Sequence, residues 1–201
     1  MNTILRKNYS GLPVSKKEVL RYSGCKNETD EITKLLDSAC KEAEGTVSFR
    51  VCYAEFPLDC EGSVCDFSFA KVNSSDLAKN LQGSKSVIIF AATIGLGFDR
   101  LIAKYNKVSP SRAVILQALG SERVEALCDE FCKDLALEKK AKGQYLKPRF
   151  SPGYGDLPLE FQRDIFRVLD CPRQIGITLG DNLLMSPSKS VTALIGITDK
   201  K

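Results

Sequence analysis

The chain has 201 residues, of which 43% are hydrophobic, so it is long enough to bury one large core. Its net charge of +4 is spread along the sequence, which is poor evidence for a nucleic-acid partner, and no apolar run reaches the roughly 18 residues of a membrane span. The absence of histidine excludes histidine-activated nucleophiles, histidine-ligated zinc or haem, and an imidazole base.

The N-terminal segment, residues 1–12, lacks the hydrophobic region of a signal peptide, so we expect a cytoplasmic protein without a membrane anchor. In that compartment the eight cysteines are expected as reduced thiols. Cys60 and Cys65 lack further ligands at a recognised metal-site spacing, and Cys128 and Cys132 lie on one helix face. Packing is the favoured role for all four, and no metal site is predicted.

The N-terminal third is predicted to form helices followed by strands. Ser15 and Glu18 have the spacing of a capping box, and Gly24 is placed to end the short helix that Ser15 begins. The spacing of apolar residues then predicts a helix at 29–45, a strand at 47–53, a loop at 57–63 and a strand at 64–72.

The most apolar run of the chain, Val87 to Ile94, predicts a buried strand. Gly95 and Gly97 follow it, and a helix is expected from Phe98 to Tyr105. Strand, Gly-x-Gly and helix is also how a dinucleotide or methyltransferase phosphate turn begins, but Arg100 stands where the third glycine would be. A turn is therefore the favoured interpretation.

A long amphipathic helix is predicted from Ser109 and Pro110 onward, with serine as N-cap and proline in the first turn. Gly120 within it marks either a break or a close helix contact. Glu125 lies beside the apolar positions of this helix, which is compatible with a solvated flank or with a ligand-binding carboxylate.

The segment from Arg149 to Pro158 contains two further prolines and two glycines, which makes it a shaped loop. Arg149 offers a planar fork for a carboxylate or phosphate, and Tyr154 offers a ring face and a hydroxyl. Gly153 would let a flat ligand approach the main chain. The chemistry alone favours the simpler alternative, a tight turn that leads into the next helix.

The remaining chain is expected as a helix at 159–169, a turn at 186–188, and strands at 174–179 and 190–197. Helices and strands are mixed without regular βαβ alternation. The predicted fold class is α+β, with a largely antiparallel twisted sheet flanked by helices.

Two motifs carry a resemblance to a known family. The segment from Arg149 to Tyr154 reads RFSPGY, a helix follows it, and the segment from Leu184 to Thr192 reads LMSPSKSVT. In this order they resemble the activation domain of cobalamin-dependent methionine synthase, whose fused form carries Arg-x-Ala-Pro-Gly-Tyr and later Met-x-Pro-x-x-Ser-Val. The resemblance is best from about Ala118 to Ile197, and it departs from the family pattern at Ser151, where the fused form has alanine.

The resemblance implies one activation domain over residues 1–201. In it, residues 1–75 would form N-terminal helices and a strand pair, and residues 85–201 a core that binds S-adenosylmethionine. The residues that would bind this cofactor are Glu125, Arg149, Ser151, Gly153 and Tyr154. Arg149 would take the ligand carboxylate, Glu125 a cationic centre, the backbone at Ser151 and Gly153 the adenine edge, and Tyr154 would close over the ligand.

The resemblance also implies a function. The family rescues methionine synthase whose cobalt is in the inactive cob(II)alamin state: an electron donor, typically flavodoxin-like, reduces cobalt and S-adenosylmethionine supplies a methyl group. No general acid or base is needed, so no catalytic residue is predicted, and whether the chain is itself an enzyme stays open. Without histidine, and without catalytic or cobalamin-binding regions, the chain resembles a stand-alone activation subunit that acts on cobalamin held by a partner methionine synthase.

Two alternatives from other classes remain. A self-sufficient Rossmann methyltransferase built on Gly95 and Gly97 would need a parallel sheet and an acidic residue at the ribose, and the sequence shows neither clearly. A non-catalytic binding module, in which the Arg149 loop is only a turn, would bind no ligand.

Overall fold

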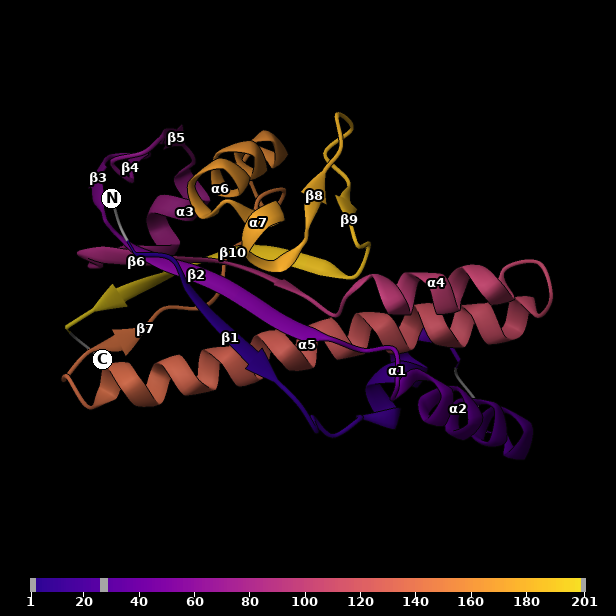
Figure 1. Ribbon diagram of the computed structural model, residues 1–201. Coiled ribbons are helices and arrows are strands. Elements are labelled where there is room, and N and C mark those ends of the chain that lie inside the picture. The colour runs from indigo at the N-terminus through magenta and orange to yellow at the C-terminus, as the bar shows by residue number, and fades with distance from the viewer. Residues whose placement is uncertain (1–2, 26–28, 200–201) are drawn as a thin grey trace.

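A five-stranded antiparallel sheet runs through the centre of the molecule (Figure 1). The computed structural model describes residues 3–25 and 29–199. The strands of this sheet lie in the order β1 (Leu5–Tyr9), β2 (Phe49–Pro57), β6 (Ser86–Thr93), β10 (Ser190–Thr198) and β7 (Tyr145–Leu146). The central strand β6 pairs with β2 and with β10 over eight residues each. Strand β10, the last strand in the sequence, therefore lies beside the central strand of the sheet.

Helices cover both faces of the sheet. One face packs against the 31-residue helix α5 (Pro110–Lys140), which is joined by α1 (Lys16–Ser23), α2 (Asp30–Ala43) and α4 (Leu96–Tyr105). The other face carries α3 (Ser75–Asn80), the 3-10 helix η1 (Leu159–Phe161), α6 (Gln162–Leu169) and α7 (Cys171–Ile175). Two small sheets complete the fold: β3 (Asp59–Glu61), β4 (Val64–Asp66) and β5 (Lys71–Asn73), and the pair β8 (Thr178–Leu179) and β9 (Met185–Ser186).

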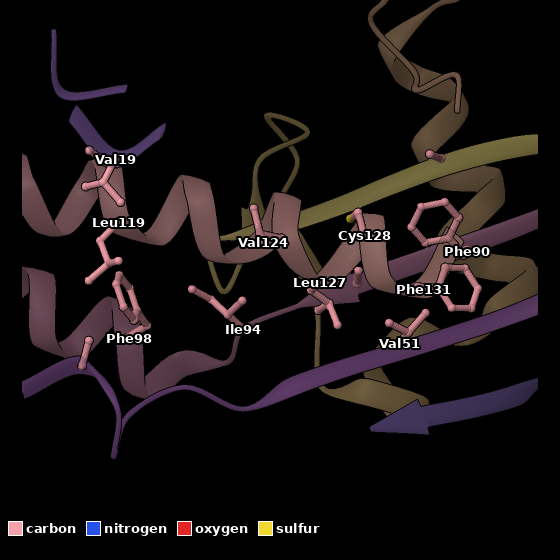
Figure 2. Packing of buried hydrophobic residues seen from close by; sticks show 14 of the residues in the cluster. Val19, Val51, Phe90, Ile94, Phe98, Leu119, Val124, Leu127, Cys128 and Phe131 are labelled. Atoms are coloured by element: carbon pink, nitrogen blue, oxygen red, sulfur yellow. The ribbon is translucent and has the colours of Figure 1, made fainter. Parts of the chain in front are cut away.

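The alternation of side chains along β6 explains why its sequence is apolar throughout. Ile88 and Phe90 belong to the core on the α5 side, whereas Val87 and Ile89 belong to the core on the α6 and α7 side. On the α5 side, Phe131 packs its ring 5.0 Å from that of Phe90, centroid to centroid (Figure 2). A strand that is buried on both faces needs apolar residues at every position.

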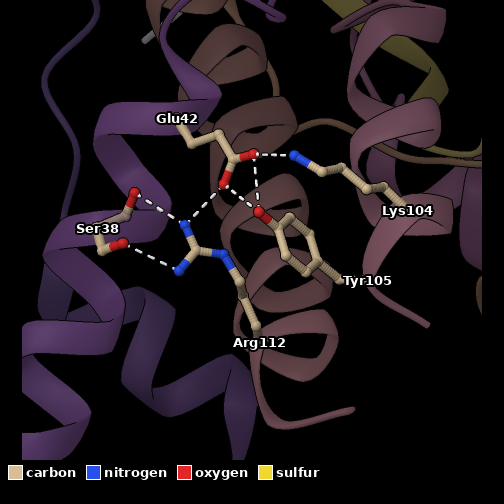
Figure 3. Close-up of polar contacts among 5 residues, drawn as sticks. All are labelled: Ser38, Glu42, Lys104, Tyr105 and Arg112. Carbon is tan, nitrogen blue, oxygen red and sulfur yellow. Dashed lines mark hydrogen bonds and ion pairs between the residues drawn. The ribbon is translucent and has the colours of Figure 1, made fainter. Parts of the chain in front are cut away.

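An ion-pair network ties three helices together on the α5 side (Figure 3). Glu42 of α2 accepts hydrogen bonds from Lys104 at 2.9 Å and Tyr105 at 2.9 Å, at the end of α4, and from Arg112 of α5 at 2.7 Å. Arg112 also binds Ser38, one turn earlier in α2. The bond from Lys104 is the main reason that the pKa of Glu42 falls to about 2, so this carboxylate is ionised at neutral pH.

Most of the predicted helices are confirmed. Ser15 caps α1 by accepting from the Glu18 amide, and Gly24 ends the helix with φ +73°. The helix containing Gly120 continues without a break. A side chain at this glycine would meet Phe98 at 2.7 Å and Lys189 at 2.9 Å, so Gly120 marks a close contact.

Several sequence expectations for strands were wrong. The strand expected at 64–72 is two short strands, β4 and β5, and β3 lies in the expected loop at 57–63. The strand expected at 174–179 is reduced to β8 because α7 occupies its first residues. Strand β1 was missed, since its sequence LRKNY is largely polar and, among the described strands, it pairs only with β2 at the sheet edge.

The turn after β6 brings the start of α4 into close contact with the segment at Thr46. At Gly97 a Cβ atom would lie 2.6 Å from the Thr46 carbonyl oxygen, and Gly95 has φ +88°. The two glycines therefore serve close packing of α4, in a sheet that is antiparallel as predicted and lacks the parallel order of a Rossmann fold. Among the described residues, no helix is both long and apolar enough to span a bilayer.

The expectation of packing for the cysteines holds only in part. Cys65 and Cys128 are buried and Cys132 is half-buried, but Cys60 is exposed. Cys60 and Cys65 are direct cross-strand partners in β3 and β4. The sequence predicted a loop at Cys60 and a strand at Cys65 but not their pairing, so it could not show that the Cys60 thiol would face solvent.

Candidate functional site

A cavity of about 370 Å³ lies beside the open edge of β10. It is walled by α5, by the loop after β7, by the start of α6, and by β9 and β10. The lining residues are Glu125, Arg149, Phe150, Ser151, Pro152, Tyr154, Gln162, Met185, Ser190, Val191 and Thr192. The two sequence motifs, separated by the segment 155–183, therefore meet at one cavity.

Four of the five predicted binding residues line this cavity: Glu125, Arg149, Ser151 and Tyr154. Gly153 does not. Its φ of +89° favours glycine, and its N–H donates to the Leu157 carbonyl at 2.9 Å inside the loop. The N–H of Gly153 is therefore already used inside the loop, so the expectation that the backbone at Gly153 meets the edge of a flat ligand does not hold for this N–H.

Arg149 is held between two carboxylates of α5. One guanidinium nitrogen donates to Asp129 Oδ1 at 2.7 Å and to Glu125 Oε2 at 3.2 Å. The arginine side chain is 27% exposed, and those of Glu125 and Asp129 are 42% and 72% exposed. Asp129 was not predicted, although it lies four residues after Glu125 and hence on the same helix face. The carboxylate of Glu125 therefore faces the cavity and the arginine, and is not a mere solvated flank.

Two thiols lie close to this charged cluster without joining it chemically. Burial raises the pKa of the Cys128 thiol well above its ordinary value, and it raises that of Cys132 to about 11. Both are therefore protonated at neutral pH and act as apolar packing beneath Arg149. In the described part of the chain, no group of three or more histidine, cysteine or acidic residues is placed to hold a metal ion.

The loop that carries Arg149 is fixed at both ends. Phe150 exchanges two backbone hydrogen bonds, of 2.9 and 2.8 Å, with Leu194 of β10. At the other end Asp156 accepts from the backbone N–H of Ser75 at 2.7 Å and from the Ser74 hydroxyl, so it caps the N-terminus of α3. This long-range cap could not be predicted from the sequence, because Asp156 lies about eighty residues after the helix that it caps.

The second motif is anchored beside the first. Ser188 donates to Asp99 of α4 through its N–H at 2.7 Å and its hydroxyl at 2.8 Å. Met185, Ser190 and Thr192 on either side of it reach the cavity. Across the mouth, Tyr154 is 69% exposed, so its ring is available to a ligand or to a docked surface.

Other cavities exist in the described structure. One of about 540 Å³ lies between β3 and α3, and its lining includes Asp59, Cys60 and Lys79. It is larger than the cavity at Arg149 but contains neither motif. The volume of a cavity therefore does not identify the candidate site. The cavity at Arg149 is the candidate because the two motifs meet there beside an ion-paired arginine.

Comparisons with known proteins agree with this placement of the motifs. Residues 70–200 match a family model described as "Vitamin B12 dependent methionine synthase, activation domain". Among solved structures, the crystal structure of the MetH reactivation domain bound to AdoHcy is similar over 96% of this chain and 78% of that chain, with a TM-score of 0.67. At 16% identity this similarity shows a shared fold.

No curated protein matches the chain. The family match, however, covers well over half of the sequence, and the similar structure supports the predicted α+β architecture with its antiparallel sheet. The chain belongs to the vitamin B12 dependent methionine synthase activation domain family.

Proposed function

We propose that the chain binds S-adenosylmethionine in the cavity beside Arg149. The observation that carries this proposal is the convergence of Glu125, Arg149, Ser151 and Tyr154 with the second motif on one cavity of about 370 Å³. A structure similar in fold is of a reactivation domain bound to AdoHcy, the product left when S-adenosylmethionine gives up its methyl group.

The charges at the cavity suit this ligand. Arg149 carries one positive charge, and Glu125 and Asp129 carry two negative charges between them, so the cluster has a net charge of about −1. S-adenosylmethionine has a net charge of about +1, from an ammonium, a sulfonium and a carboxylate. The arginine fork pairs with the ligand carboxylate, and Glu125 attracts a cationic centre. The demethylated product has lost the sulfonium charge and is held less tightly.

The site works by positioning. The methyl group of the ligand is already on a good leaving group, so no proton transfer is needed from the chain. The substrate is cob(II)alamin held by a partner protein: one electron from a reductant, for instance a flavodoxin-like protein, reduces the cobalt, and the methyl group then passes to it as the sulfonium becomes a neutral thioether. Tyr154, which lines the cavity and is largely exposed, is the residue that we propose faces the docked partner.

We further propose that the partner is a cobalamin-binding methionine synthase and that the chain acts on it as a separate subunit. The support is the family membership together with a sequence that has no histidine to offer to cobalt. In this arrangement the chain turns over nothing alone. The contact with the partner must be transient, because the same corrin face has to be released for catalysis.

Two measurements test the proposal. Titration calorimetry of the purified chain should show one binding site for S-adenosylmethionine and weaker binding of S-adenosylhomocysteine. In the second, methionine formation is followed from a cob(II)alamin-form synthase without a functional activation domain, supplied with ligand and reductant. Activity should return only when the chain is added. Absence of binding would refute the proposal that the chain binds S-adenosylmethionine. Binding without rescue would refute the proposal that its partner is a methionine synthase.

A further inference from the structure

Two residues of the cavity lining each carry a buried side-chain oxygen that has no hydrogen-bond partner among the described residues. They are Oε1 of Gln162, in the first turn of α6, and Oγ1 of Thr192, on β10. The two residues are only 6% and 2% exposed. An unpaired buried polar atom costs about 1–3 kcal/mol and is rare in native proteins. Two of them in one cavity wall indicate that a ligand supplies the missing partners.

Both side chains lie on the same side of the sheet. Thr192 shares the strand face of Leu194, which belongs to the core under α6 and α7, and Gln162 is the first residue of α6. The backbone of β10 is also open there. Leu194 bonds to Phe150 at the outer edge, and among the described strands β7 pairs only with Ile197 and Thr198. The main-chain groups of Thr192 point to that same edge, next to the ligand loop.

The cavity wall is divided by charge and depth. Its charged members, Arg149 and Glu125, are partly exposed, whereas Gln162 and Thr192 are neutral and buried. Moving an ion away from water costs far more than moving a neutral polar group that finds a hydrogen bond. The charged part of a ligand therefore belongs beside Arg149, and a neutral part with N–H and O–H groups belongs at the buried wall.

We propose that Gln162 and Thr192 bind the adenosine part of the S-adenosyl ligand, an assignment that rests on the proposed function. Gln162 Oε1 accepts a hydrogen bond from an N–H or O–H of the adenosine, and the Thr192 hydroxyl exchanges one with the same neutral part. Arg149 and Glu125 hold the amino-acid part. The two pairs of residues thus recognise different halves of one molecule.

The test compares two ligands by calorimetry: S-adenosylmethionine and 5′-methylthioadenosine, which has the adenosine but no amino-acid part. Thr192→Val and Gln162→Leu should each weaken the binding of both ligands about tenfold, the effect of one neutral hydrogen bond. Arg149→Ala should weaken only S-adenosylmethionine. Ser84→Ala is the matched control, because Ser84 Oγ is also buried and unpaired but does not line this cavity.

Thermal unfolding of the free variants separates binding from folding. Thr192→Val keeps the shape of the side chain and removes an unpaired hydroxyl, so the melting temperature should stay the same or rise while affinity falls. If the wild-type chain binds S-adenosylmethionine and both variants bind it equally well, the assignment is wrong and the proposed function stands. If the wild-type chain does not bind S-adenosylmethionine, the proposed function itself fails.

Discussion

Replacing Arg149 by alanine is the sharpest single test of the ligand site. The variant removes a guanidinium that donates to Asp129 at 2.7 Å and to Glu125 at 3.2 Å, and that is proposed to pair with the ligand carboxylate. A charge-assisted hydrogen bond at a partly exposed site contributes about 2 kcal/mol, so the dissociation constant for S-adenosylmethionine should rise about thirtyfold. The two carboxylates left behind repel the carboxylate of the ligand and act in the same direction.

The effect of this change on folding should be smaller. Both acidic partners are substantially exposed, and such ion pairs contribute about 0.2–1 kcal/mol each. Cys128, close to Arg149, belongs to the buried core on the α5 side. We therefore expect the free energy of unfolding to fall by about 0.4–2 kcal/mol, which leaves the variant folded during the titration.

The assay is calorimetry with S-adenosylmethionine at fixed ionic strength, together with chemical unfolding of each variant. Arg149→Lys keeps the charge but loses the planar fork, so its affinity should lie between those of the wild type and the alanine variant. Arg163→Ala is a suitable control, since this arginine donates to the Asp181 carbonyl and does not line the cavity. Unchanged affinity in Arg149→Ala would refute the placement of the ligand carboxylate.

Three further predictions concern the framework of the site. Gly155→Ala should lower the melting temperature and weaken rescue of the synthase, because Gly155 has φ +53° and its Cβ would collide with the Asp76 carboxylate. Gly120→Ala should destabilise the chain by about 1–2 kcal/mol in urea unfolding, since overpacking against the buried Phe98 ring outweighs the ~1 kcal/mol that alanine adds to a helix. Glu42→Gln should cost about 1 kcal/mol of unfolding free energy at pH 7, and this difference should vanish as the pH falls from about 4.5 to 2, as urea titrations at each pH would show.

The sign of the pH effect follows from the direction of the pKa shift. The pKa of Glu42 is lower in the folded chain than in the unfolded chain, so its ionised form stabilises the fold above the unfolded value and protonation removes that contribution. If the difference in unfolding free energy between the wild type and Glu42→Gln instead increased as the pH fell, the stabilising role of the ionised Glu42 would be refuted. For the glycine variants, Gly143→Ala is the control: it has φ +72°, and a Cβ there meets nothing within 4 Å.

How far the sequence predicts this fold depends on how local each signal is. The capping box at Ser15, the apolar run of β6 and the helix start at Pro110 are local signals, and each element formed where expected. The short strands β3 to β5 and β9 carry two or three residues each, which is too few for a period to be read. The edge strand β1 depends on its pairing with β2, a contact that no local pattern records.

The site shows the same division. Arg149 and Tyr154 could be singled out from side-chain chemistry and from the resemblance, and both line the cavity. Asp156 and Gln162 could not, because the roles of these two residues depend on which helix or strand lies opposite them in space. At Gly153 the reason is the converse one: its N–H, part of the backbone expected to meet a ligand edge, donates instead to the carbonyl of Leu157, only four residues away. Turn chemistry predicted the loop, and contacts within the folded chain decided which of its residues line the cavity.

The position of β10 also has a consequence for synthesis of the chain. Strand β6 is complete at Thr93, but the strand that covers its second edge begins only at Ser190. At about 5–20 residues per second, a ribosome needs roughly 5–20 s to make the intervening segment. Throughout that interval the sequence VIIFAA presents an unpaired, uncharged strand edge of the kind that associates with other chains. Nascent or prematurely ended chains should therefore depend on chaperones more than their finished stability suggests.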